Sequence, residues 1–133
     1  MVEVLQKSLV VHETHRAGFV VMLDHVHAIL FGNEEFNVSR FVQVWKKTSS
    51  YRMKRFYEKE LTHYLKFFPD DGPIWPPGFY DFNIDSDAKN NEKLDYMHNN
   101  PVVDNLVSTH VLWNRSSARF YELGESGGVA ITP

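Results

Sequence analysis

Two histidines stand two positions apart in an otherwise apolar stretch, FVVMLDHVHAILF, at residues 19–31. The stretch is rich in β-branched and aromatic residues, so we expect one continuous strand over residues 17–32. Side chains alternate along a strand, which would place His25 and His27 on one face with Cβ atoms roughly 6 to 7 Å apart. That spacing suits two imidazoles that bind one cation. The alternative is a pair of histidines with no more than a structural role, so a metal site needs a further ligand elsewhere.

A candidate for that ligand lies in the segment KLDYMHNNPV. If this segment is helical, Tyr96 and Asn100 lie on one face about one turn apart, while His98 points well away from both. Asn100 supplies an amide oxygen that can bind a hard cation, and Tyr96 supplies a phenol. Two neutral histidines and one amide would leave a divalent ion with its full charge and open positions, which suits polarisation of a phosphoryl oxygen. The alternative is that Tyr96 packs in the core and Asn100 caps the helix.

Length and composition indicate one ordinary globular domain. The chain has 133 residues, of which 43% are hydrophobic and 23% charged, and it contains no cysteine, which excludes disulfides and thiolate metal sites. No apolar run approaches about 18 residues, so we expect no membrane span. The N-terminal residues lack the pattern of a secretory signal, and we expect a soluble, cytoplasmic protein.

Hydrophobic spacing and capping residues predict a fold that mixes helices with strands. The expected helices cover residues 2–14, residues 37–68 as one long helix or two shorter ones, and the region from about residue 86 to 100; a short strand is expected at 78–84 and a turn or helix at 113–123. Asn37 or Ser39 would begin the second helix, and Asp85 or Ser86 the third, with Pro101 closing the third or opening the next turn. This order favours an α+β sandwich, with helices packed on an antiparallel or mixed sheet.

Positive charge is concentrated in one part of the chain, although the formal net charge is -3. Residues 40–66 hold eight of the 14 Lys and Arg residues and only two acidic ones. Phosphate binding depends on local positive potential more than on net charge. The segment therefore indicates a phosphate-binding surface, with an ordinary solvated helix face as the alternative.

Four ordered blocks of the chain resemble the HUH single-tyrosine transposases, in particular the branch called REP-associated tyrosine transposases. The blocks are MLDHVHAIL, WPPGFYDFNI, LDYMHNNPVVDNLV and WNRSSARFY, and the resemblance runs from about residue 5 to 121. It implies a ferredoxin- or RRM-like sandwich, either with or without its first strand. It also implies an IS200-like transposase domain at residues 1–122, followed by a flexible tail at 123–133.

The resemblance further implies a mechanism. His25, His27 and Asn100 match the family's metal-binding positions, for Mg²⁺ or Mn²⁺, and Tyr96 matches the nucleophile that leaves a 5′-phosphotyrosine and a free 3′-hydroxyl. The expected substrate is single-stranded or hairpin DNA, and the protein is expected to act as a homodimer or a monomer. Basic side chains would contact the DNA backbone, namely those of Lys46, Lys47, Arg52, Lys54 and Arg55.

Several positions depart from the family pattern. Pro76 and Pro77 replace a Gln-Arg pair, and Val103 replaces a frequent lysine, so polar contacts to DNA are lost. These departures leave a second hypothesis open, a degenerate DNA-binding remnant without turnover. A third is a metallohydrolase that uses water in place of the tyrosine.

Overall fold

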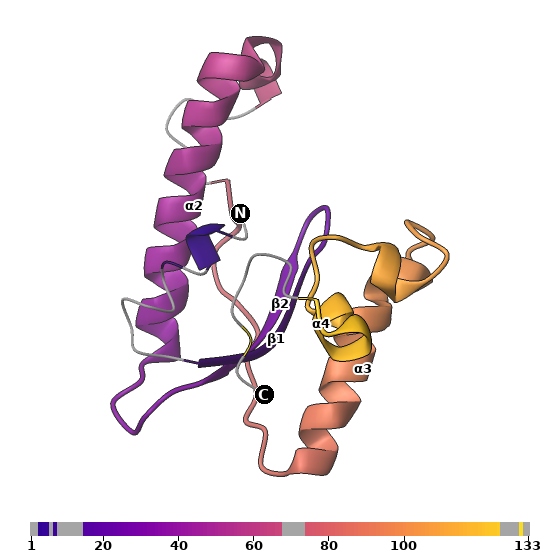
Figure 1. Cartoon of the computed structure of the whole chain (residues 1–133). Coiled ribbons are helices and arrows are strands. Elements are labelled where there is room, and N and C mark those ends of the chain that lie inside the picture. Colours follow the sequence, from indigo (N-terminus) through magenta and orange to yellow (C-terminus); the bar gives the residue numbers. More distant parts are fainter. Residues whose placement is uncertain (1–2, 6, 8–14, 68–73, 126–130, 132–133) are drawn as a thin grey trace.

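The computed structural model describes residues 3–5, 7, 15–67, 74–125 and 131 (Figure 1). The elements in chain order are β1 (His15–Val21), β2 (Val26–Phe31), α2 (Val38–Glu60), the 3-10 helix η1 (Thr62–Phe67), α3 (Asp87–Val103), the 3-10 helix η2 (His110–Leu112) and α4 (Ala118–Leu123). Residues 3–5 and 7 are helical, as expected for 2–14, while the rest of that segment lies outside the described residues. Among the described helices, none combines the length and apolar content that a membrane crossing requires.

The apolar stretch around the two histidines is a hairpin, so the expectation of one strand over residues 17–32 was wrong. β1 and β2 pair antiparallel, and the chain reverses between them. The N–H of Met22 donates to the carbonyl of His25 at 2.9 Å, which closes the turn. Leu23 and Asp24 form its exposed tip. The turn contains no glycine, proline or asparagine, so Asp24 is the only residue at its tip of a type that turns favour.

The edge of β1 that does not face β2 pairs with residues 115–117, a segment far along the chain. The N–H of Val21 donates to the carbonyl of Arg115 at 2.8 Å, and the N–H of Ser117 donates to the carbonyl of Phe19 at 2.9 Å. β1 therefore lies between β2, its partner in the two-stranded sheet, and this segment, which meets it in an isolated bridge. The result is the expected α+β class, an antiparallel sheet with helices packed on it, consistent with a truncated ferredoxin-like fold.

Helices cover β1 on both faces. Phe19 and Val21 belong to a core cluster with Phe41 and Trp45 of α2. The side chain of Asn37 accepts a hydrogen bond from the backbone of Arg40 and caps this helix, as one of the two expected N-caps. The later part of α2, together with η1, extends away from the hairpin (Figure 1).

The opposite face of β1 receives α3. Val20, which is fully buried, packs in a second cluster with Leu94 and Met97 of the helix. Gly18 makes this approach close, because a Cβ at its position would lie 2.4 Å from both Leu94 Cδ2 and Met97 Cε. The helix begins after Ser86, whose hydroxyl accepts from the N–H of Lys89. The contact at Gly18 therefore brings the helix that carries Tyr96 against the hairpin that carries the histidines.

Two local expectations were wrong. Pro101 does not end α3; it is buried inside the helix, which continues to Val103. A proline within a helix removes one hydrogen bond, and the burial of this ring offsets part of that cost. Residues 78–84 form no strand. Just before them, the ammonium of Lys46 donates to the carbonyls of Pro76 and Gly78, so a side chain of α2 binds this backbone in place of a neighbouring strand.

A buried polar contact fastens α3 to β1. A hydrogen bond of 2.7 Å joins Nε2 of His98 to Oγ of Ser117. The same hydroxyl accepts from the N–H of Phe19 at 2.9 Å. Burial lowers the pKa of His98 to about 4; the charge of His110 adds to this effect, while nearby carboxylates oppose it. His98 is therefore neutral at physiological pH in the folded protein.

We expect acid to destabilise the fold through His98. Between pH 6.5 and about 4 the unfolded chain holds a proton on this imidazole that the folded chain does not, so stability falls as pH is lowered through this range. The free energy of unfolding should fall by about 2 kcal/mol over this range. This is less than the pKa shift of His98 alone would give, because solvent screens part of the electrostatic effect. Urea unfolding of wild type and His98→Gln at several pH values measures it. Gln keeps a hydrogen-bonding group but cannot titrate, and an equal acid dependence in both proteins would contradict this account.

Candidate active site

The hairpin turn positions the first histidine. Nδ1 of His25 lies 2.6 Å from Oδ1 of Asp24, so Nδ1 donates and the imidazole presents the lone pair of Nε2 outward. The hydrogen bond from His25 and the charge of its ring lower the pKa of the Asp24 carboxyl. A histidine that gives one N–H to a carboxylate is oriented to bind a metal through its other nitrogen. Sequence reasoning gave Asp24 no role, although its position beside His25 could have suggested one.

The two histidines share a face, as predicted, although only one belongs to a strand. The rings of His25, in the turn, and His27, in β2, have centroids 4.9 Å apart and meet edge to face at 87°. Burial lowers the pKa of His27, and the charge of His25 lowers it further. Both effects favour the neutral imidazole, which is the form that binds a metal.

Tyr96 lies against this pair. Its ring centroid is 5.9 Å from that of His27, with an interplanar angle of 81°. Tyr96 is 59% exposed, so the phenol is open to a substrate and does not form part of the core. Its neighbours Leu94 and Met97 point inward against β1, and this packing sets the face of α3 that Tyr96 occupies. The structure thus brings together side chains that the sequence places far apart.

Asn100 follows Tyr96 by one helical turn, about 6 Å along the axis. Its Nδ2 atom is buried and has no hydrogen-bond partner among the described residues. A buried amide group without a partner is costly, and its two orientations exchange the positions of nitrogen and oxygen. In the other orientation Oδ1 would take this position, where a bound cation would satisfy it.

The predicted ligands His25, His27 and Asn100 are of the donor types that bind a hard or borderline divalent ion, and ring contacts bring the two histidines and Tyr96 together. No group of three or more His, Cys, Asp or Glu residues in the described part of the chain could hold a metal, so a carboxylate-rich site is not present there. The candidate set comprises two imidazoles and one amide, all neutral. The carboxylate of Asp24 contacts Nδ1 of His25 and supplies negative charge next to the proposed ligands without being one of them.

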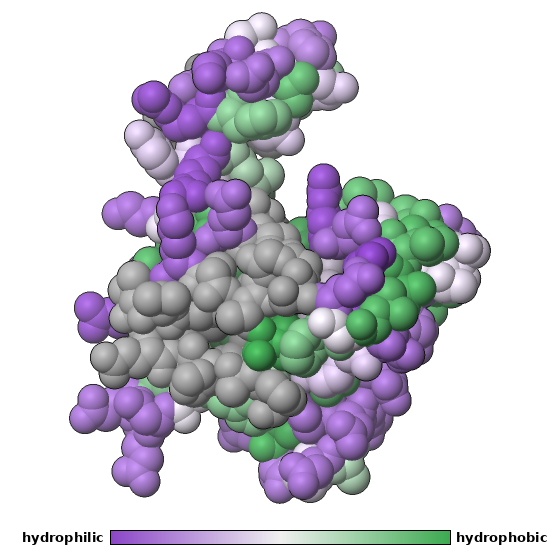
Figure 2. Space-filling view, viewed as in Figure 1, coloured by the Kyte–Doolittle hydropathy of each residue, from purple (hydrophilic) through white to green (hydrophobic). Residues whose placement is uncertain are grey.

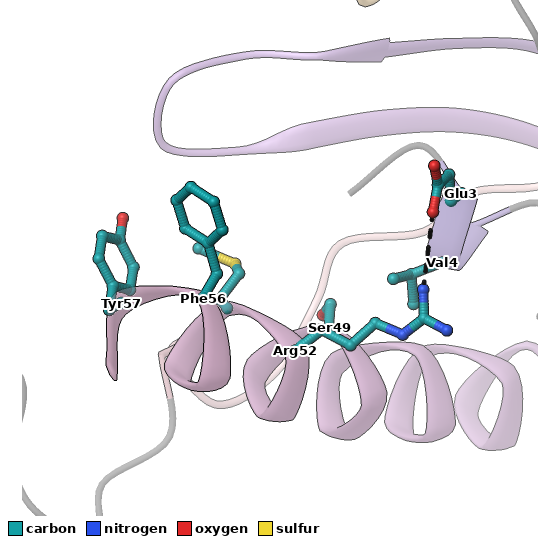
Figure 3. Close-up of a pocket in the computed structure, with 7 residues that line it drawn as sticks. Glu3, Val4, Ser49, Arg52, Phe56 and Tyr57 are labelled. Carbon is teal, nitrogen blue, oxygen red and sulfur yellow. Dashed lines mark ion pairs between the residues drawn. The ribbon is translucent and has the colours of Figure 1, made fainter. Parts of the chain in front are cut away.

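The predicted DNA-contacting residues lie on α2, which packs on the other face of β1. Lys47 and Arg55 are exposed, and Figure 2 shows mainly hydrophilic side chains over the part of α2 that extends from the body. Arg52 approaches Glu3 at 3.9 Å beside an open pocket of 290 Å³, which Figure 3 shows in close-up. The ammonium of Lys46 donates hydrogen bonds to the backbone carbonyls of Pro76 and Gly78. None of the predicted catalytic or metal-binding side chains lines this pocket.

A lysine that sequence reasoning missed stands between Tyr96 and a neighbouring aromatic residue. Nζ of Lys93 lies 5.7 Å from the ring centroid of Tyr96 and 4.8 Å from that of Phe82. Its position three residues before Tyr96 on the helix was the available signal, because residues three apart lie on one face.

Comparison with known proteins gives one match. A family model described as "Transposase IS200 like" matches residues 3–100, a range that contains both histidines, the tyrosine and, at its end, the asparagine. No curated protein and no solved structure matches the chain.

We expect the contact with Asp24 to set the tautomer of His25. At pH 8, well above the ordinary imidazole pKa, nitrogen NMR should show the proton of His25 on Nδ1. Asp24→Ala removes the acceptor and should raise the population with the proton on Nε2. The exposed neighbour provides a matched control, since Leu23→Ala should leave the tautomer unchanged. The same tautomer in wild type and Asp24→Ala would show that Asp24 does not orient the ring.

Proposed function

The chain belongs to the IS200-like transposase family, and on this premise we propose that it is a metal-dependent DNA strand transferase whose nucleophile is Tyr96. The observation that supports this best is the packing of the His27 ring against Tyr96 at 5.9 Å. It places a metal-binding type of side chain from the hairpin beside an exposed phenol from α3. A purely structural tyrosine would not need this surface position.

The proposed reaction exchanges one phosphodiester for another. The phenolic oxygen of Tyr96 forms a bond to a backbone phosphorus of single-stranded DNA, and the bond from phosphorus to the 3′ oxygen breaks. The proton lost by the phenol is balanced by the one gained by the 3′ oxygen, which leaves a 5′-phosphotyrosine and a 3′-hydroxyl. Attack by another 3′-hydroxyl reverses the step and joins two strands. The number of ester bonds is unchanged, so the reaction requires no nucleotide hydrolysis.

In this proposal the metal site consists of His25, His27 and Asn100. When bound there, Mg²⁺ or Mn²⁺ supplies positive charge that polarises the phosphoryl oxygen and favours the phenolate. The protein holds His25 in the metal-binding tautomer through Asp24. Partial burial keeps His27 neutral. The packing of α3 on β1 orients Tyr96 toward the same place.

The basic side chains of α2 are proposed to bind the DNA backbone outside the reacting phosphate. The candidates are the exposed Lys47, Arg52 and Arg55 and the half-buried Lys54, because phosphate binding by surface cations needs no fixed geometry. In this proposal Lys46 contributes to DNA binding indirectly, because its ammonium is hydrogen-bonded to the backbone carbonyls of Pro76 and Gly78 and positions that segment.

We expect Tyr96→Phe to abolish covalent capture of DNA. Phenylalanine keeps the ring but has no oxygen to attack phosphorus, so the adduct with a 3′-labelled single-stranded oligonucleotide should fall at least about a hundredfold on a denaturing gel with Mn²⁺. Tyr64→Phe, in η1, is the matched control and should form the adduct as wild type does. An undiminished adduct in Tyr96→Phe would refute the assignment.

The same experiment separates the alternatives. Wild-type protein that binds the oligonucleotide but forms no adduct with Mn²⁺ would be a DNA-binding remnant, a possibility that the prolines at 76 and 77 favour. Cleavage that leaves free 5′-phosphate ends without an adduct would instead indicate a metallohydrolase.

We expect His27→Ala to weaken metal binding. Loss of one of three ligands should reduce the affinity for Mn²⁺ at least about tenfold, measured by calorimetric titration at pH 7.5. His63→Ala, in η1, removes a histidine far along the chain from the proposed site and should leave the affinity unchanged. Equal Mn²⁺ affinity in wild type and His27→Ala would exclude this ligand set.

A further inference from the structure

Two exposed aromatic rings lie on the segment before α3, and one of them contacts the same lysine as Tyr96. Tyr80 is 89% exposed and Phe82 is 45% exposed. Their ring centroids are 6.2 Å apart with an interplanar angle of 44°. Rings two residues apart contact each other only where the backbone is extended, so Asp81, between them, projects to the other side. Large aromatic rings that remain in water beside a reactive group indicate a binding surface.

The segment that bears these rings is anchored at both ends. On one side the indole Nε1 of Trp75 donates to Oγ of Ser49 at 2.8 Å, and Lys46 binds the backbone at 76 and 78. On the other side Ile84 packs against the core cluster that contains Leu94 and Met97. The exposed rings are therefore carried by a segment whose ends are fixed, which keeps them near α3.

Lys93 connects the aromatic pair to the proposed nucleophile. Its ammonium lies 4.8 Å from the ring centroid of Phe82 and 5.7 Å from that of Tyr96. Glu92 approaches it at 3.6 Å, but both oxygens of that carboxylate bind Lys89 at 2.9 Å. Among the described residues, the contacts of the Lys93 ammonium are this ion pair with Glu92 and the two aromatic rings. The Lys93 ammonium thus has N–H donors available to bind an anionic oxygen beside Tyr96.

We propose that Tyr80, Phe82 and Lys93 form a subsite for the nucleotide next to the phosphodiester that Tyr96 attacks. Every nucleobase has a flat face that stacks on aromatic rings, and an ammonium beside them binds the attached phosphate. This combination of rings and cation matches single-stranded DNA, in which the bases are free to stack. The inference rests on the proposed function for the identity of its ligand.

The first test measures binding without cleavage. A fluorescein-labelled 20-nucleotide single strand of mixed sequence is titrated with the full chain in the absence of divalent metal, by fluorescence anisotropy. Tyr80→Ala and Phe82→Ala should each weaken binding about tenfold, as expected for loss of one stacked base. Tyr80→Phe keeps the ring and should restore binding. An oligonucleotide that carries abasic residues should bind wild type more weakly, and this difference should shrink in the two alanine variants.

The second test isolates Lys93 through salt dependence. For single strands, each phosphate contact adds about 0.7 to the slope of log affinity against log salt, so Lys93→Ala should reduce the slope by about that amount. Lys89→Ala is the matched control, because it removes a lysine one turn away that binds the same Glu92, and it should leave the slope unchanged. An equal slope in wild type and Lys93→Ala would exclude the phosphate contact.

The outcomes separate this subsite from the proposed reaction. If wild type forms the Tyr96 adduct while neither ring variant changes DNA affinity, the subsite is refuted and the reaction stands. If the ring variants weaken binding as expected but no adduct ever forms, the subsite stands and the strand transfer fails. A change in sedimentation of Tyr80→Ala at unchanged DNA affinity would identify the rings as a contact between copies of the chain and overturn the proposal.

Discussion

The close approach of α3 to β1 at Gly18 determines the geometry of the candidate site. A Cβ at this position would lie 2.4 Å from the ends of Leu94 and Met97, so a larger residue would require these two side chains to repack against the strand. The hydrogen bond between His98 and Ser117 adds a directional constraint, because Ser117 is itself bonded to the backbone of β1. With these residues turned inward, the face of α3 that bears Tyr96 meets His27. The proximity of phenol and imidazole is thus a consequence of core packing.

The parts of this arrangement that depend on local patterns were predictable from the sequence. The caps at Asn37 and Ser86 follow from short-range rules, and the structure confirms them. His25 and His27 are in ring contact, although His25 lies in the turn and only His27 in a strand. The turn at Leu23 and Asp24 was missed, because a single aspartate within an apolar stretch is a weak turn signal and the pairing of β1 with residues 115–117 is a long-range contact. The prediction that Pro101 ends α3 was wrong for a related reason. The burial of its ring depends on the complete fold, and it outweighs the tendency of proline to end a helix.

The segment from Trp75 to Ile84 links the two faces of the molecule. Trp75 packs against Trp45 in the cluster of α2, with ring centroids 5.1 Å apart, whereas Ile84 packs in the cluster of α3. Figure 1 shows this stretch of chain passing from α2 to the start of α3. The ammonium of Lys46, a residue predicted to contact DNA, donates to the carbonyls of Pro76 and Gly78 and so helps to hold this segment against α2. The basic helix and the helix of Tyr96 are therefore coupled through one anchored segment.

The neutrality of the proposed ligand set bears directly on the chemistry. A carboxylate bound directly to the ion would cancel part of its charge, and the phosphodiester already brings one negative charge to the site. Here the nearby carboxylate, that of Asp24, is not among the proposed ligands. It accepts a hydrogen bond from Nδ1 of His25 and is exposed at the turn. Negative charge there orients the imidazole while the ion keeps its charge for the substrate. In the same way, the partial burial of His27 favours its neutral form without adding an anion. These features suit an ion whose task is to stabilise a phosphate and a phenolate together, which is the demand that attack by Tyr96 would impose.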